Sequence, residues 1–159
     1  MQLEAIDRQI IQTTQAGLPL VAEPYQAIAE QLDLSAEEVM QRISNMQQNG
    51  VIRRIAAVPN HYKLGYRYNG MTVWDVDDKH VDALGQRVAE LPFVSHCYQR
   101  PRYLPDWPYN LFAMVHGKTE QDAERQIAII AELLGSDVRR NTVLYSTKIL
   151  KKTGLRIAG

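Results

Sequence analysis

The chain has a single cysteine, Cys97, so it can form neither an internal disulfide nor a cysteine-cluster zinc site. No apolar run approaches the roughly 18 residues that a membrane-spanning helix needs, and the first residues lack the basic-then-apolar pattern of a signal peptide. The sequence also lacks the phosphate-binding glycine loops, the G-x-S-x-G elbow and the H-E-x-x-H zinc motif. From these absences we expect a soluble cytoplasmic protein with no membrane association.

An excess of charge of either sign is also missing, since 18 basic and 18 acidic residues cancel. No global charge therefore attracts nucleic acid or an anionic membrane. The distribution is uneven, however: the first 50 residues hold two basic and seven acidic side chains, a net charge of −5, which leaves +5 for the remainder. Because the chain is long enough for two small domains, we predict one over residues 1–58 and a second over 59–159.

The first domain shows the apolar periodicity of helices over residues 3–16, 25–32 and 36–49. The third begins with a capping box, Ser35 to Glu38, and ends at Asn49-Gly50, a pair suited to a left-handed cap. Three helices with a short turn at residues 33–34 describe a helix-turn-helix unit. Residues 51–58, V-I-R-R-I-A-A-V, are typical of a strand that leaves this unit.

The second domain follows a different pattern. Asn69-Gly70 indicates a turn, and strands are predicted over 71–76, 93–100, 109–116 and 141–150. Amphipathic helices are predicted around 81–91 and 123–134, the latter capped by Thr119. The order βαββαβ predicts an α+β, ferredoxin-like domain with both helices on one face of a four-stranded sheet. We expect a partner chain or a ligand to cover the other face.

The central hairpin of that sheet carries an unusual set of side chains. By strand alternation, each strand presents four residues to one face: Val94, His96, Tyr98 and Arg100 on the first strand, and Asn110, Phe112, Met114 and His116 on the second. In one possible register of the hairpin, in which paired residue numbers sum to 212, His96 lies opposite His116. In a register shifted by two places, His96 lies opposite Met114 instead. In either register the two histidines can act on one ligand, while Cys97 points into the core.

Other candidate residues lie in loops and on the exit segment. His61 and Tyr62 belong to a polar, aromatic loop, where a histidine can bind iron, move a proton or form a local hydrogen bond. Arg53 and Arg54 point to opposite faces of a strand, so one can bind a carboxylate in a site or both can be solvated. Trp107 can stack on a planar ligand or pack within its own loop.

A helix-turn-helix followed by a ferredoxin-like domain resembles the AsnC/Lrp family of transcription regulators. That resemblance implies DNA binding, but the charge pattern argues against it. The candidate recognition helix, 36–49, has a net charge of −1, with Glu37 and Glu38 at the end that would meet base edges. Since DNA affinity depends largely on neutralising phosphates, we do not expect DNA as a partner, and we predict a structural or dimerisation role for this unit.

Three segments are more specific. Residues 50–67 (G-V-I-R-R-I-A-A-V-P-N-H-Y-K-L-G-Y-R), 95–100 (S-H-C-Y-Q-R) and 107–117 (W-P-Y-N-L-F-A-M-V-H-G) resemble the sirohaem decarboxylases, which are AsnC/Lrp-like enzymes. The resemblance implies removal of carboxyl groups from the C12 and C18 acetate side chains of sirohaem. The product, didecarboxysirohaem, would serve haem d1 or alternative haem biosynthesis. It also implies a homologous partner subunit in a heterodimer or larger assembly, or else a homodimer.

Under this resemblance the candidate residues take roles around a flat, polyanionic tetrapyrrole. Either His96 or His116 would be the catalytic acid, and His61 or His96 would be the ligand of the substrate iron. Tyr98 would orient a carboxylate by a hydrogen bond. The remaining candidates would bind the substrate: Arg53, Arg54, His61, Tyr62, Arg100, Trp107 and Asn110.

No cofactor is expected beyond the iron of sirohaem itself. Two alternatives stay open at the level of sequence. One is a DNA-binding regulator of the AsnC/Lrp type. The other is a subunit without catalysis of its own that completes the site of a partner.

Overall fold

The computed structural model describes residues 2–151 and 156–157, and the chain divides into two compact units. One unit comprises Met1–Val58 together with the segment from Lys151, and the other comprises Pro59–Leu150. Across the described residues, no helix has both the length and the apolar character needed to cross a membrane.

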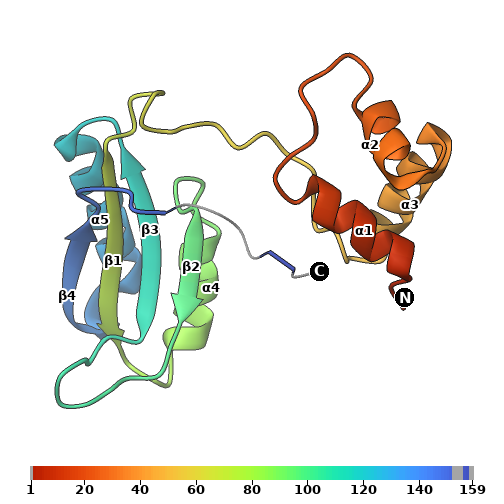
Figure 1. Ribbon diagram of the computed structural model, residues 1–159. Helices are drawn as coiled ribbons and strands as arrows, with labels where there is room; N and C mark the ends of the chain where they lie inside the picture. Colours follow the sequence, from red (N-terminus) through yellow and green to blue (C-terminus); the bar gives the residue numbers. More distant parts are fainter. Residues whose placement is uncertain (1, 152–155, 158–159) are drawn as a thin grey trace. The chain divides into compact units, whose positions relative to one another are not determined.

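The first unit is a three-helix bundle made of α1 (Ala5–Thr14), α2 (Pro24–Leu32) and α3 (Ala36–Gln48) (Figure 1). One apolar stripe from each helix meets at its centre, and these buried residues are Ile10, Ile28, Ala29, Val39, Ile43 and Met46. The turn between α2 and α3 is tight because Asp33 adopts a left-handed conformation. The helix-turn-helix prediction is therefore confirmed.

The boundaries of α3 follow from local chemistry. The Ser35 hydroxyl accepts a hydrogen bond from the Glu38 backbone N–H at 3.1 Å, which satisfies one of the otherwise unpaired donors of the first turn. At the other end Gly50 takes a φ of +73°, a conformation that glycine adopts without a steric penalty. Both ends lie where the sequence predicts them.

The strand predicted over residues 51–58 is wrong. The segment is irregular and largely exposed. The N–H groups of Val51 and Ile52 both donate to the Met46 carbonyl, at 2.9 and 3.0 Å, and so close the end of α3. Alternating apolar residues alone do not make a strand when no neighbouring strand supplies the ladder of hydrogen bonds.

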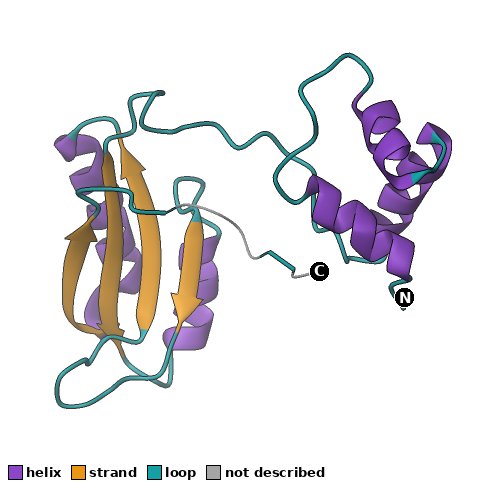
Figure 2. Cartoon of the chain, in the orientation of Figure 1, coloured by secondary structure: helices purple, strands orange, loops and turns teal. Residues whose placement is uncertain are grey.

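The second unit is the ferredoxin-like domain. Its elements are β1 (Tyr68–Val76), α4 (Val81–Ala89), β2 (His96–Gln99), β3 (Leu111–Gly117), α5 (Glu120–Leu134), the short 3-10 helix η1 (Gly135–Asp137) and β4 (Val138–Tyr145). The strands are antiparallel in the order β2-β3-β1-β4. Figures 1 and 2 show α4 and α5 together behind the sheet. Large apolar residues fill the layer between helices and sheet, including Trp74, Val88, Leu111, Val115, Ile130 and Leu134.

Two differences from the predicted domain shape the site. Asn69 and Gly70 do not form a turn but lie within β1, opposite His116 and Val115 of β3. Gly70 is needed there for space, because a Cβ atom on it would lie 2.9 Å from the Val143 side chain. Strand β2 is also shorter than expected, and Val94 packs with the helix-side core instead of the opposite face.

Candidate functional site

The face of the sheet opposite the helices carries the candidate residues. In this structure His96 pairs with Met114 and Tyr98 pairs with Phe112, which is the register shifted by two places. On the other side of β3, Asn69 of β1 pairs with His116. Residues that pair directly across strands share a face, so His96, Tyr98 and His116 lie on one surface with Asn69. Cys97 points the other way, with its Sγ 3.6 Å from the Gly85 carbonyl of α4, as predicted.

The two histidines are joined by a residue that precedes β2. The Ser95 Oγ lies 3.0 Å from His96 Nδ1 and 2.7 Å from His116 Nε2. The second ring nitrogen of His116, Nδ1, lies 2.6 Å from the Asn69 Oδ1. His116 is half-buried, whereas Ser95 and His96 are exposed. The histidines thus form one hydrogen-bonded group that runs from the sheet to the surface.

The predicted loop histidine belongs to the same group. The His61 ring meets the His116 ring edge-on, with centroids 5.9 Å apart. Tyr62 lies beside His61, with ring centroids 4.7 Å apart. Three histidines from the loop 60–67, β2 and β3 are therefore gathered at one end of the open face.

Arginine and aromatic side chains occupy the other end of this face. The guanidinium carbon of Arg100 lies 5.4 Å from the Tyr98 ring centroid and 5.1 Å from that of Phe112. The Trp107 ring stacks on that of Phe112, with ring centroids 6.5 Å apart and an interplanar angle of 17°. Phe112 itself is only 5% exposed, so the aromatic groups that a ligand would meet are the accessible Tyr98 and Trp107. Together with the exposed Arg100 cation they suit a planar, anionic ligand.

Asn110 has a different place from the predicted one. It is buried, accepts a hydrogen bond from the Val76 N–H at 2.9 Å and donates to the Val76 carbonyl at 2.9 Å and to Asp78 at 3.1 Å. Its amide therefore fastens the loop before β3 to the end of β1. The prediction that it binds substrate draws no support from this geometry.

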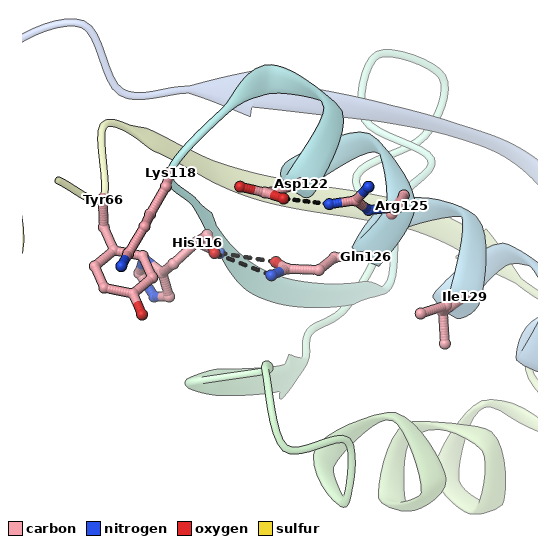
Figure 3. Close-up of a pocket in the computed structure, with 7 residues that line it drawn as sticks. All are labelled: Tyr66, His116, Lys118, Asp122, Arg125, Gln126 and Ile129. Atoms are coloured by element: carbon pink, nitrogen blue, oxygen red, sulfur yellow. Dashed lines mark hydrogen bonds and ion pairs between the residues drawn. The ribbon is translucent and has the colours of Figure 1, made fainter.

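A pocket of about 380 Å³ lies behind His116, at the edge of the sheet that the short β2 leaves open. Figure 3 shows Tyr66 and Lys118 side by side at its mouth, and the Lys118 Nζ lies 5.2 Å from the Tyr66 ring centroid. On the far wall, Gln126 of α5 accepts from the His116 N–H at 3.1 Å and donates to its carbonyl at 3.0 Å (Figure 3). This clamp fixes the backbone of His116 where no β2 residue pairs with it.

Two predicted residues lie in the other unit. Arg53 and Arg54 belong to the irregular segment that follows α3, so their opposed orientation on a strand no longer applies. Their role as carboxylate-binding residues stays a prediction.

Two residues of the histidine group are absent from the set predicted from sequence. Ser95 precedes β2, so strand alternation gives no guide to its direction. Asn69 forms an Asn-Gly pair, which usually indicates a turn. The sequence does not reveal that Ser95 and Asn69 contact the same histidine until the registers of β1 and β2 against β3 are known. Those registers are tertiary properties.

Family models match both units: a siroheme decarboxylase NirDL-like helix-turn-helix domain at residues 7–53 and an AsnC-like ligand-binding domain at residues 63–151. The siroheme decarboxylase NirH subunit of Pseudomonas aeruginosa is 59% identical over 95% of this chain and 88% of its own length. The siroheme decarboxylase beta subunit of Methanosarcina barkeri is 41% identical over 98% of this chain and 100% of its own.

Solved structures agree. The crystal structure of the siroheme decarboxylase NirDL is 33% identical, with a TM-score of 0.65, over 98% of this chain and 47% of that one. E. coli AsnC superposes with a TM-score of 0.76 at 17% identity over 98% of this chain and 99% of its own, which shows the shared fold alone.

Proposed function

Because the chain belongs to the siroheme decarboxylase family of AsnC/Lrp-like proteins, we propose that it is a sirohaem decarboxylase subunit whose substrate lies on the open face of the βαββαβ sheet. The observation that carries this proposal is the gathering of His61, His96 and His116 at one end of a sheet face whose other end carries Tyr98, Trp107 and the exposed Arg100. The reaction would remove carboxyl groups from the C12 and C18 acetates and give didecarboxysirohaem.

Decarboxylation requires a proton donor and a group that accepts the electron pair of the breaking carbon–carbon bond. A proton added to a pyrrole ring carbon lets the ring accept the electron pair of the breaking bond between methylene and carboxylate, so carbon dioxide leaves and an exocyclic methylene group remains. A proton added to this methylene then gives the methyl group, and the ring carbon gives back the proton that it first received. The balance is one proton consumed for each carbon dioxide released. Histidine titrates near neutral pH and is suited to supply that proton.

The contacts of the two sheet histidines divide the roles between them. Both ring nitrogens of His116 are within hydrogen-bond distance of protein atoms, whereas His96 uses only Nδ1 and has no hydrogen-bond partner for Nε2 among the described residues. His96 would therefore meet the substrate directly and bind its iron. His116 would hold the proton, and the exposed Ser95 hydroxyl beside it would pass this proton to the substrate.

Carboxylates of the bound tetrapyrrole need cations. Arg100 is exposed beside the aromatic side chains of the open sheet face, and Lys118 lies at the mouth of the pocket behind His116. Arginine keeps its charge at all accessible pH values and can bind a carboxylate through two parallel hydrogen bonds. Tyr98, at 45% exposure, can donate a hydrogen bond to the same group.

The relatives named as subunits support a further part of the proposal, namely that this chain works together with a homologous subunit. The open sheet face would then be completed by the partner. A subunit that only completes a partner's site is the second candidate, and the names of the relatives favour it as much as a catalytic subunit.

The test is to add anaerobic sirohaem to the purified chain, with and without the homologous subunit from the same source, and to follow the product mass and the visible spectrum. We expect a loss of two carbon dioxide units. His96→Ala should abolish both the spectral shift and turnover, and His116→Ala should keep the shift and lose turnover. Full activity in both variants would place the site elsewhere. Turnover that persists when only the partner keeps its histidines would make this chain the non-catalytic subunit.

A further inference from the structure

The histidine group continues inward beyond His116. The Asn69 Nδ2 donates to the Tyr66 carbonyl at 3.1 Å, and its Oδ1 lies 2.6 Å from His116 Nδ1. From there the group passes through Ser95 to His96. Asn69 is only 3% exposed, so neither end of its amide can turn to water instead. These hydrogen bonds connect a backbone carbonyl to the surface through Asn69, His116, Ser95 and His96.

Donor and acceptor roles along this series of hydrogen bonds are fixed from its inner end. A backbone carbonyl only accepts, so the NH₂ group of Asn69 must face Tyr66. The Asn69 oxygen then faces His116, and because that oxygen also only accepts, His116 Nδ1 must carry the hydrogen. In neutral His116 the other nitrogen, Nε2, is consequently an acceptor.

The donor and acceptor roles of Ser95 and His96, nearer the surface, follow in the same way. A hydroxyl has one hydrogen to donate and lone pairs that accept. Since neutral His116 Nε2 can only accept, the Ser95 hydroxyl hydrogen must point to it across the 2.7 Å contact. The 3.0 Å contact on the other side then requires His96 Nδ1 to be the donor. With both rings neutral, this is the one arrangement that satisfies these four contacts together.

We infer that Asn69 and Ser95 are positioning residues that hold His96 in the Nδ1–H tautomer, so that its Nε2 lone pair faces the open sheet surface. This inference rests on the proposed function for its ligand, the iron of sirohaem. Histidines that bind metals commonly donate their other ring N–H to a protein acceptor, which fixes the tautomer and the ring orientation. The arrangement supplies that form before any substrate arrives.

The first experiment needs no substrate. The full-length protein is labelled with ¹⁵N-histidine, and the tautomers are identified by NMR from two-bond couplings at a pH of about 8, where histidine is neutral. We expect the Nδ1–H form for both His116 and His96. Because an unconstrained imidazole side chain in water favours Nε2–H, Ser95→Ala should return His96 to that form while Ser95→Thr, which keeps the hydroxyl, should not.

Ser95 is exposed, so its alanine variant leaves the core intact, whereas a change at buried Asn69 can unfold the sheet. The comparison of Ser95→Ala with Ser95→Thr therefore tests whether the tautomer of His96 is fixed, without the need for an Asn69 variant. An Nε2–H tautomer of His96 in the unmodified protein overturns the inference, and so does an unchanged tautomer in Ser95→Ala.

The second experiment adds anaerobic sirohaem and titrates the visible spectrum. We expect Ser95→Ala to weaken binding by about 10- to 100-fold, the usual effect of removing such a partner of a metal-bound histidine, and Ser95→Thr to restore it. Equal affinity of both variants and the unmodified chain overturns the inference. If the unmodified chain does not bind sirohaem at all, the proposed function fails, and the NMR result separately decides whether the tautomer is fixed.

Discussion

Nη1 of Arg42 on α3 lies 3.0 Å from Oδ1 of Asp7 on α1. The same guanidinium also contacts Glu38 and Glu4, each at 3.0 Å. The hydrogen bonds that Arg42 donates to Glu38, Glu4 and Asp7 together raise its pKa above the usual value. The single basic residue of the third helix is therefore held within the helical unit, where it cannot neutralise a phosphate.

Replacing Arg42 by methionine should destabilise the helical unit by about 2 kcal/mol, because Asp7, with a side-chain exposure of 6%, would lose its charged partner. The measurement is urea unfolding followed by circular dichroism. Arg8→Met on the same helix as Asp7 is the matched control, since Arg8 is exposed. Equal unfolding midpoints in the two variants would show that the contact with Asp7 contributes nothing.

DNA binding should be weak for the same reason. The unit has a net charge of −5 over residues 1–50, and its third helix begins with Glu37 and Glu38. We expect a fluorescently labelled duplex to bind no tighter than about 10⁻⁴ M at physiological salt, the weak end of non-specific binding. A submicromolar dissociation constant, with an affinity that falls steeply as the salt concentration rises, would instead favour a DNA-binding regulator of the AsnC/Lrp type.

Periodic patterns predicted much of the fold. The apolar stripes of α3 and α5, with caps at Ser35 and Thr119, predicted both helices near their observed bounds, because caps and stripes are local properties. Strands were predicted less well. Residues 51–58 have strand composition but no partner strand, and Asn69-Gly70 has turn composition but lies in β1. Pairing depends on distant residues, and composition does not reveal it.

The candidate site, like the fold, was predicted where local patterns suffice and was missed where strand pairing decides. Alternation predicted that His96, Tyr98 and His116 share a face, and the register confirmed this. Asn69 joins the group through the pairing of β1 with β3, and Ser95 joins it through the pairing of β2 with β3, so residues 26 positions apart in sequence come within reach of one histidine. Alternation did not predict the position of the Asn110 amide, which binds the Val76 carbonyl, because β3 begins after this residue, at Leu111.

Burial raises the pKa of the Cys97 thiol above its usual value. Less of it is therefore ionised at neutral pH than in a free cysteine, and only the thiolate reacts with alkylating agents. We expect slow alkylation by iodoacetamide in the native protein, with a rate that climbs only as the pH passes through this raised pKa. Mass spectrometry gives the rate, and the same chain in urea is the control. Equal native and unfolded rates at neutral pH would contradict the prediction.

Gly117 lies next to His116, where α5 approaches the sheet. A Cβ atom there would lie 2.6 Å from the Thr119 carbonyl and 2.8 Å from the Ala123 nitrogen, both of them backbone atoms. Gly117→Ala should cost about 2 kcal/mol of unfolding free energy through overpacking.

The matched control for that change is Gly85→Ala in α4, whose Cβ would meet only the end of the Leu111 side chain at 3.1 Å. The gain in helix propensity, about 1 kcal/mol, offsets this contact. Thermal unfolding compares the two variants. A loss for Gly85→Ala as large as that for Gly117→Ala would mean that the backbone approach at α5 is not the cause.

Substitutions of two neighbouring arginines should affect different quantities: Arg102 should matter for stability, and Arg100 for substrate binding. Arg102 has a side-chain exposure of 11% and donates to Asp75 at 2.8 Å and to the Pro108 carbonyl at 2.7 Å, so it fastens the loop that carries Trp107. Arg100 is exposed over the aromatic side chains of the open sheet face. Arg102→Met should lower the unfolding free energy by about 2 kcal/mol. Among the residues that the structure describes, Asp75 would then keep only the longer contacts to Arg139 and Arg140 of β4, at 3.7 and 3.6 Å.

Arg100→Met should leave the unfolding midpoint unchanged and weaken sirohaem binding by about tenfold to a hundredfold, the loss expected for one charge-assisted hydrogen bond. The methionine keeps apolar contact with Phe112, so a fall in affinity reports the charge and not the packing. Urea unfolding and spectral titration of both variants give the two quantities. If Arg100→Met binds sirohaem as tightly as the unmodified chain, the substrate carboxylates lie away from this end of the sheet.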